Sequence, residues 1–265
     1  MQAASRESYQ AAREQLGSAT ITVADEILAF AGLLAREPRL RRALSDPSRS
    51  SSERAELARG LLSGKVSDGA LEPIGTLASG RWSAASELLE GAERLGVDAL
   101  LSSAEQSGDL AEVEDELFRF GQIVSGDPKL AAILGDSTVD TGRRTTVARE
   151  LLEGKAKPVT VKLAELAVRG FGGRGFANGL TRLVELAAER REAEIAYVTV
   201  AEPLSEAEEE RLAATLTRRY GKQISIKVMV EPGVLGGMSV RIGSDLYDGT
   251  VARRLATVRT ALVAR

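Results

Sequence analysis

The chain has 265 residues, which gives room for two modest domains with a substantial core. It contains neither cysteine nor histidine, so disulfides, thiolate chemistry and the commonest general base and metal ligand are excluded. A net charge of −3 gives no global electrostatic case for binding nucleic acid or anionic lipid. No apolar run approaches the roughly 18 residues of a membrane span, and the N-terminus has no signal-peptide core, so no direct membrane insertion is expected.

The first two thirds of the chain contain an internal repeat. Residues 24–65 align without a gap on residues 114–155, an offset of 90 residues. The repeated apolar spacing and the repeated proline predict one helical supersecondary unit used twice, over 1–96 and 97–192. The identical pairs include Asp25/Asp115, Glu26/Glu116, Phe30/Phe120, Pro38/Pro128, Asp46/Asp136, Arg54/Arg144, Arg59/Arg149, Gly64/Gly154 and Lys65/Lys155.

Each unit is predicted to contain about six short helices. Gly64 and Gly154 suit the left-handed position that ends a helix. Each is followed by lysine, but no upstream glycine completes a phosphate-binding loop, so a nucleotide site is disfavoured. The expected helices are 4–16, 20–36, 38–45, 51–63, 68–80 and 83–95 in the first unit, and 97–107, 110–126, 128–135, 141–153, 158–170 and 176–192 in the second.

Residues 193–265 change to a strand pattern and predict a small α/β domain with a mixed sheet and two helices. Alternating apolar residues predict a first strand containing Ala196, Val198 and Val200, and later strands over 223–230 and 236–242, with Leu246–Tyr247 able to add a short one. Ser205 followed by Glu208 predicts a capping box for a helix over 205–219. A closing helix is expected after Asp248, which would cap it, with an apolar stripe at Val251, Leu255, Val258 and Leu262.

Carboxylates in this domain suggest an enzyme as one hypothesis, using Glu208–Glu210 with Asp245 or Asp248. The first group lies at a helix start, where negative charge complements the helix dipole, and Asp248 is more simply a cap. Gly236–Gly237 does not have the spacing of a phosphate-cradling loop either. A small sheet whose glycines serve backbone geometry explains this segment without chemistry.

A specific pattern runs through residues 234–255. It closely resembles the C-terminal signature of the δ subunit of rotary ATP synthases, the bacterial counterpart of the oligomycin sensitivity conferral protein. Thr250 stands where that family most often has serine. The matching residues are Leu235, Gly236, Gly237, Ile242, Gly243, Asp248, Gly249, Val251, Arg254 and Leu255.

The resemblance extends over about 98–265, which is similar to a complete bacterial δ subunit. Val198, Thr199, Ala201, Pro203 and Leu204 match the family's crossover into its C-terminal domain. The first unit is extra, and resembles the longer form found in actinobacteria. Its opening residues Ala4, Ser5, Arg6 and Glu7 and the pair Arg81–Trp82 also occur there.

The resemblance implies a non-catalytic stator subunit without cofactors, peripheral on the cytoplasmic face of the membrane. Its helical part would bind the N-terminal helices of the α subunits, and its C-terminal domain the b-type peripheral stalk. By analogy the helix-binding groove lies between the first and fifth helices of a unit, although its candidate residues could equally be core residues. A stand-alone helical adaptor is the alternative, against which the glycine pattern argues. The groove candidates are Leu100, Leu101, Leu163, Leu166 and Val168.

Overall fold

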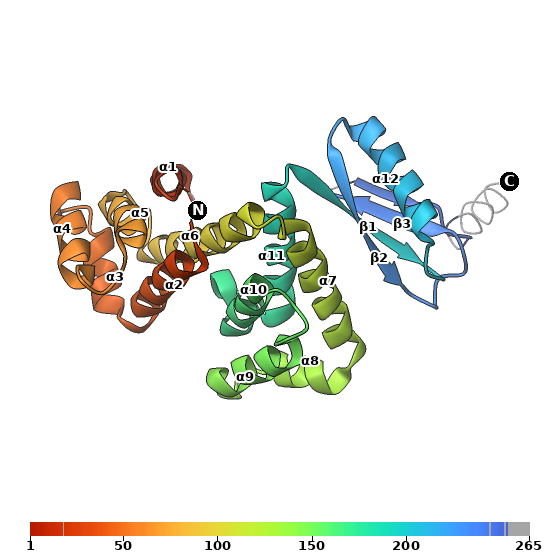
Figure 1. The fold of residues 1–265 in the computed structure, drawn as a ribbon, viewed down its shortest axis with the longest axis horizontal. Helices are drawn as coiled ribbons and strands as arrows, with labels where there is room; N and C mark the ends of the chain where they lie inside the picture. Colours follow the sequence, from red (N-terminus) through yellow and green to blue (C-terminus); the bar gives the residue numbers. More distant parts are fainter. Residues whose placement is uncertain (18, 244, 252, 254–265) are drawn as a thin grey trace, which may run out of the picture.

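The computed structural model describes residues 1–17, 19–243, 245–251 and 253 of the chain. Two helical units lie side by side, and a small sheet covered by one helix follows them at the C-terminal end (Figure 1). The chain is therefore mainly helical with a small α/β C-terminal domain, as the sequence predicts. No helix among these residues is both long and apolar enough to cross a membrane.

The first helical unit follows the predicted boundaries closely. Proline at the first position of α3 fixes its start, because the ring supplies a helical φ where no backbone donor is needed. Ser50 and Glu53 form a capping box that starts α4. The helices are α1 (Ala3–Glu14), α2 (Ile21–Arg36), α3 (Pro38–Ser45), α4 (Ser51–Leu62) and α5 (Asp68–Ser79).

The sixth helix corrects the sequence prediction. Helices expected over 83–95 and 97–107 are one helix, α6 (Ala85–Gln106), about 33 Å long at 1.5 Å per residue. Gly96 lies in its middle, and a Cβ there would overlap the Leu28 side chain. This glycine therefore allows α2 to pack closely on α6 and does not break the helix. The predicted boundary at 96/97 falls inside a helix that both units share.

The second unit repeats the first and leads into the sheet. A short 3-10 helix, η1 (Phe171–Gly173), precedes its last helix and has no counterpart in the first unit, where the shorter segment after α5 carries the buried Trp82. Trp82 packs against Gly91 of α6 and donates its indole N–H to the Leu77 carbonyl at 2.9 Å. The helices are α7 (Leu110–Gly126), α8 (Pro128–Gly135), α9 (Thr141–Leu152), α10 (Pro158–Arg169) and α11 (Phe176–Arg190).

Hydrogen bonds of polar side chains repeat along with the helices. Arg54 and Arg144 are both buried. The Arg54 guanidinium donates to carbonyls of the segment before α4, and the Arg144 guanidinium donates to the Leu134 carbonyl of α8 and to the Val139 carbonyl before α9. Glu26 accepts hydrogen bonds from the amide and hydroxyl of Ser67, and Glu116 accepts from the Lys157 amide and the Thr160 hydroxyl. Equivalent side chains make similar hydrogen bonds in both units, which supports a duplicated unit.

The predicted helix-ending glycines behave alike as well. Gly64 and Gly154 have φ of +71° and +74°, the left-handed conformation that glycine adopts at little cost. They lie directly after the C-cap residues Ser63 and Glu153, at the C′ position that the sequence predicts. Apolar residues of both helical units belong to one continuous buried cluster, so α6 joins the units through a common core.

The C-terminal domain contains a four-stranded sheet with the order β2-β1-β3-β4. β1 pairs in parallel with β2 and antiparallel with β3, and β3 pairs antiparallel with β4. Glu208 accepts from the Ser205 amide at 2.9 Å and from its hydroxyl at 2.6 Å, which confirms the predicted capping box. The elements are β1 (Ala193–Val200), α12 (Glu206–Tyr220), β2 (Gln223–Val230), β3 (Met238–Ile242) and β4 (Asp245–Asp248).

The two faces of the sheet have different neighbours. Ala196, Val198 and Val240 form a separate small core with Leu216 of α12, which lies across one face (Figure 1). Ile195 belongs instead to the large helical core, and Tyr197 packs against that core. The sheet therefore lies between α12 and the second helical unit.

Candidate partner-binding surfaces

The five predicted groove residues lie inside the second unit, on α6 and α10. Leu100, Leu101 and Leu163 are fully buried, while Leu166 and Val168 are 7% and 2% exposed. Their side chains belong to the continuous helical core. In this conformation they are core residues, so a partner helix could touch them only if α6 and α10 separated. Binding of a helix near these two elements stays a prediction.

An apolar groove opens elsewhere on the second unit, between α7, α8, α11 and the sheet. Its volume is about 370 Å³, and its apolar walls include Phe118, Phe176 and Leu180. Phe176 packs edge-on against Phe120, with ring centroids 5.9 Å apart. Polar groups lie among these walls, including Gln122 and Arg241.

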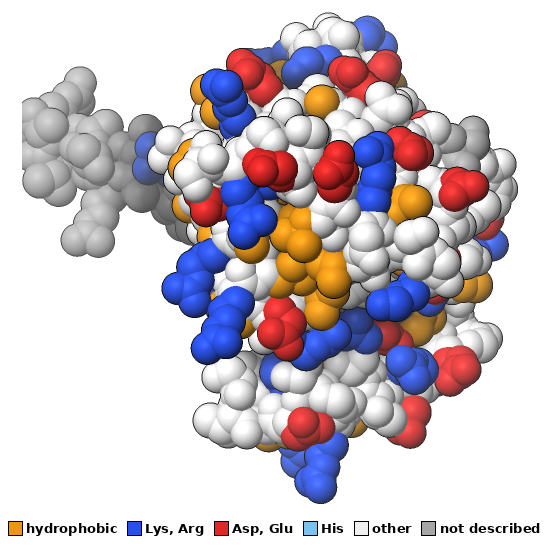
Figure 2. Space-filling view, turned by 90° about the vertical axis from the view of Figure 1, so that its left-hand side faces the viewer, with side chains coloured by type: hydrophobic (Ala, Val, Ile, Leu, Met, Phe, Trp, Pro, Cys, Tyr) orange, Lys and Arg blue, Asp and Glu red, His pale blue; other side chains and the backbone are white. Residues whose placement is uncertain are grey.

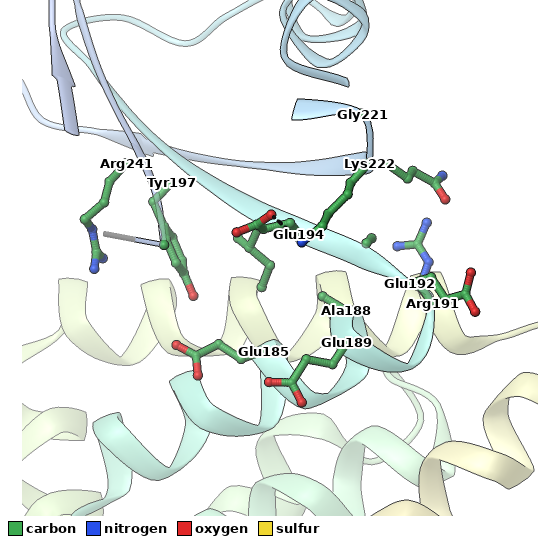
Figure 3. Close-up of a pocket in the computed structure, with 14 residues that line it drawn as sticks. Glu185, Ala188, Glu189, Arg191, Glu192, Glu194, Tyr197, Gly221, Lys222 and Arg241 are labelled. Atoms are coloured by element: carbon green, nitrogen blue, oxygen red, sulfur yellow. Dashed lines mark ion pairs between the residues drawn. The ribbon is translucent and has the colours of Figure 1, made fainter. Parts of the chain in front are cut away.

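A larger and more polar hollow of about 840 Å³ lies at the junction of α11 with the sheet (Figure 3). Glu185 and Glu189 of α11 face Tyr197 and Arg241 of the sheet across it. The Arg241 guanidinium stacks over the Tyr197 ring at 5.0 Å from its centroid. Burial, and then the nearby Glu185 charge, raise the pKa of Tyr197 to about 12, so this phenol stays neutral near pH 7.

The glycine-rich segment of the C-terminal domain has the backbone geometry that its sequence predicts. Gly236 and Gly237 have φ of +87° and +80°, and a Cβ on Gly237 would lie 2.5 Å from the Gly249 carbonyl oxygen. The Gly236 carbonyl accepts from the Val251 amide at 3.1 Å. The two most specific features of the pattern, its glycine pair and its D-G pair, therefore lie against each other.

Asp248 has a different role from the predicted one. It ends β4, and its carboxylate accepts from the amide and hydroxyl of Thr250 at 3.0 and 2.7 Å. The Thr250 hydroxyl in turn accepts from the Arg253 amide at 3.3 Å, which is the N-cap contact expected of Asp248. Ile242 is buried and Gly243 has a φ of +54°. Arg254, Leu255, Val258 and Leu262 lie outside the described residues.

Two other carboxylates of the enzyme hypothesis, Glu208 and Asp245, have structural partners. Glu208 belongs to the capping box of α12, and Asp245 accepts from the Tyr220 hydroxyl at 3.0 Å. Ser205 lowers the pKa of Glu208, and Thr250 lowers that of Asp248, by donating hydrogen bonds to the charged form. Neither carboxyl group is tuned toward accepting a proton near neutral pH. Among the described residues, no group of three or more Asp or Glu side chains is placed to hold a metal ion.

Exposed apolar side chains concentrate in the C-terminal domain. Six of the nine large ones in the described part of the chain fall within residues 230–251, so this domain presents the most apolar surface. Leu235 and Leu246 are 70% and 63% exposed. The other four are Val230, Met238, Tyr247 and Val251.

Comparisons with known proteins show the family of this chain. A sequence profile described as "ATP synthase delta (OSCP) subunit" matches residues 97–262. The chain belongs to this family. It is 59% identical to "ATP synthase subunit delta" of Salinispora arenicola and 57% identical to that of Salinispora tropica, with all of each chain covered. The subunit of Streptomyces griseus is 43% identical over 98% of this chain and all of its own length.

Among solved structures, this δ-family chain aligns with a chain of the Toxoplasma gondii mitochondrial ATP synthase hexamer. The alignment covers 64% of this chain and 96% of that one, at 20% identity and a TM-score of 0.39. The sequence resemblance to the long actinobacterial form is confirmed, because the relatives from Salinispora and Streptomyces match over the full length, including the extra first unit.

The extra first unit of this δ-family chain has a mixed polar surface on its outer end. Figure 2 shows lysine, arginine and acidic side chains interspersed around a small group of hydrophobic ones on that end. Leu61, 36% exposed, is the one clearly exposed large apolar side chain in the described residues of α1–α5. This unit therefore offers no broad apolar face.

Sequence reasoning missed the contact between α7 and β2. Glu114, Lys227 and Arg191 meet there in a buried ion-pair network. One sequence signal is Lys227, which lies in the middle of β2 on the polar side of the strand's alternation, the side that would normally face solvent. Comparison of the repeats offers a second signal, because Glu114 occupies the position of the buried Ala24.

Proposed function

We propose that this chain is a non-catalytic stator subunit of an F-type ATP synthase. It links the catalytic head, which consists of three α and three β subunits, to the peripheral stalk. The head thereby resists the torque of the rotor during proton-driven ATP synthesis. The observation that carries the proposal is the family match over residues 97–262 together with full-length relatives named as ATP synthase subunit delta. The complex would place the chain peripherally on the cytoplasmic face of the membrane.

The helical part is the proposed partner of the catalytic head. The N-terminal helices of the α subunits would bind to the second unit near α6 and α10, above the buried Leu100, Leu101, Leu163, Leu166 and Val168. Helix-in-groove binding suits a bundle, because an amphipathic partner helix adds one more packed element. The first unit would add a further contact with the head or the stalk, and the shared helix α6 supports joint action of both units.

The C-terminal domain is the proposed partner of the b-type stalk subunits. Its exposed apolar side chains support this assignment, because a concentration of exposed apolar side chains is typical of a binding surface. The domain has its own small core, so it can present this surface independently of the helical core. The proposed domain boundary at 192/193 falls where the two-residue connection between α11 and β1 ends.

The test compares two binding reactions of the full-length chain, one with a soluble b-type stalk fragment and one with α-subunit N-terminal peptides. Leu235→Asp combined with Leu246→Asp should weaken stalk binding at least about tenfold, and leave the α-peptide affinity unchanged. Ile123→Asp is the matched control, because Ile123 is 61% exposed but lies on α7. It should bind the stalk as wild type does. Undiminished stalk binding by the Leu235/Leu246 variant would contradict the assignment of the C-terminal surface.

Hydrogen exchange locates the other contact in the same samples. Protection of α6 and α10 amides by α-subunit peptides is expected. Protection confined to α1–α5 would show that the first unit, not the second, is the main contact with the head.

A further inference from the structure

The C-terminal domain is attached to the helical part by a very short connection. Only Arg191 and Glu192 separate the end of α11 from the start of β1. Glu192 has a φ of +56°, the left-handed region that non-glycine residues rarely adopt. A connection this short restricts how far the sheet can move, but a single backbone bend does not by itself fix the orientation of the sheet.

A buried ion-pair network lies where the sheet meets α7. Glu114 of α7 is fully buried, and its two carboxylate oxygens lie 2.8 Å from Lys227 Nζ of β2 and 2.8 Å from Arg191 Nη1. The Ser225 hydroxyl donates to the same carboxylate at 2.6 Å. Lys227, 2% exposed, also pairs with Asp115. Two cations and two carboxylates therefore balance in charge. The carboxylates come from α7, and the cations come from β2 and from the connection.

Further contacts between α7 and the sheet lie next to the ion-pair network. Lys227 Nζ lies 5.8 Å from the centroid of the Phe118 ring, and that ring lies 6.3 Å from the ring of Tyr197. Further along α7, Gln122 donates to the Val228 carbonyl at 2.8 Å. The polar hollow and the apolar groove described above both open beside this contact. Side-chain packing between the sheet and the helices is therefore interrupted at both places.

The internal repeat provides a natural comparison for this network. Ala24 and Asp25 of α2 stand where α7 has Glu114 and Asp115. Ala24 is buried against other helices, and no sheet meets the described residues of the first unit at this place. Asp25 pairs instead with Lys162 of the second unit, at 2.8 Å. The buried glutamate is thus found in the copy to which the sheet is attached, and not in the copy without one.

We infer that Glu114, Lys227, Arg191 and Asp115 form a lock that fixes the orientation of the C-terminal domain on the second helical unit. Buried charges are stabilised only while their partners remain close and well aligned. A small rotation of the sheet would leave Glu114 and Lys227 without partners in a poorly solvated site. The network therefore favours one orientation. Its use as a stiff joint between head and stalk rests on the proposed function, whereas the lock itself does not.

The test measures the distance between two spin labels in the full-length chain. Because the chain has no cysteine, Glu150→Cys on α9 and Glu210→Cys on α12 provide two unique attachment sites on exposed side chains. Pulsed electron paramagnetic resonance on this background gives the distribution of distances between the helical unit and the C-terminal domain. Glu114→Gln keeps the size of the side chain and removes its charge.

Glu114→Gln should broaden the distance distribution about twofold, because the sheet then samples several orientations on the helical unit. The matched control is Glu165→Gln, since Glu165 is also buried and ion-paired, with Arg149 at 2.6 Å, but lies within the second unit. Its distribution should keep the wild-type width. A distribution for Glu114→Gln as narrow as that of wild type would overturn the lock.

A milder variant covers the case in which Glu114→Gln does not fold. Asp115→Asn removes the half-exposed partner of Lys227, and a smaller broadening is expected. Wild-type width in this folded variant would then overturn the proposal. These distances are measured without any partner, so loss of stalk or head binding in the experiments above would leave the lock standing, and the reverse also holds.

Discussion

Gly237 offers a quantitative test of the C-terminal domain. Replacement by alanine puts a Cβ on a residue with a φ of +80°, which costs about 1–2 kcal/mol of domain stability for an L-residue. That Cβ would also lie 2.5 Å from the Gly249 oxygen and 3.1 Å from Thr250 Cα, both parts of the main chain. Relieving the clash must shift the strand ends and strain the Gly249–Met238 hydrogen bond of 2.9 Å, at a further cost of about 1–3 kcal/mol. Gly237→Val adds β-branching and should cost more.

Gly221 is the matched control within the same domain. It has a φ of +67°, and a Cβ added to it would meet no atom within 4 Å. Gly221→Ala should therefore cost only the conformational term of about 1–2 kcal/mol. Thermal unfolding, monitored by the hydrogen exchange of β1 and β3 amides, reports on this domain. Each kcal/mol of lost unfolding free energy should lower its melting temperature by roughly 4–8 °C. Equal melting temperatures for the two alanine variants would refute the close approach of the two main-chain segments.

Two tyrosines with opposite surroundings give further predictions. The Tyr197 hydroxyl is buried without a hydrogen-bond partner among the described residues, so Tyr197→Phe should keep or raise stability, by up to about 1 kcal/mol in denaturant unfolding. Tyr9 donates to Asp98, which is 3% exposed, so Tyr9→Phe should lower stability by about 1–3 kcal/mol, and an equal response of both variants would contradict this reasoning. In alkali, the folded chain holds the Tyr197 proton up to a pKa of about 12, compared with 10.0 for the unfolded residue. The free energy of unfolding should therefore fall as the pH rises from about 10 to about 12. In the Tyr197→Phe variant it should fall less steeply over the same range.

Helix and strand positions were predictable because the chain marks its own element ends. Pro38 and Pro128 start α3 and α8, and Gly64 and Gly154 end α4 and α9 within about a turn. The strand over 223–230 and the capping box at Ser205 follow from local pattern alone. In each case the decisive interaction is within a few residues, so sequence spacing contains the necessary information.

The rest depends on contacts between distant segments. The sequence predicted separate helices over 83–95 and 97–107, yet α6 runs through Gly96, where Leu28, 68 residues earlier, packs into the space that the glycine leaves. The burial of Lys227 could not be predicted, because alternation along β2 cannot show that α7 brings Glu114 to the sheet face opposite α12. The burial of Leu163 and Leu166 likewise depends on which helices cover α10. Sequence pattern indicates the amphipathic faces but not their partners.

Coupling of ATP hydrolysis to proton movement tests the stator assignment most directly. Membranes carrying the ATP synthase of the same organism would be stripped of this subunit and then supplied with the purified chain. Proton pumping driven by ATP should be lost on stripping while ATP hydrolysis by the head continues, because an unrestrained head turns with the rotor. Pumping should return with the full-length chain and not with residues 1–192. Proton pumping that is the same with and without the chain would contradict the proposed function.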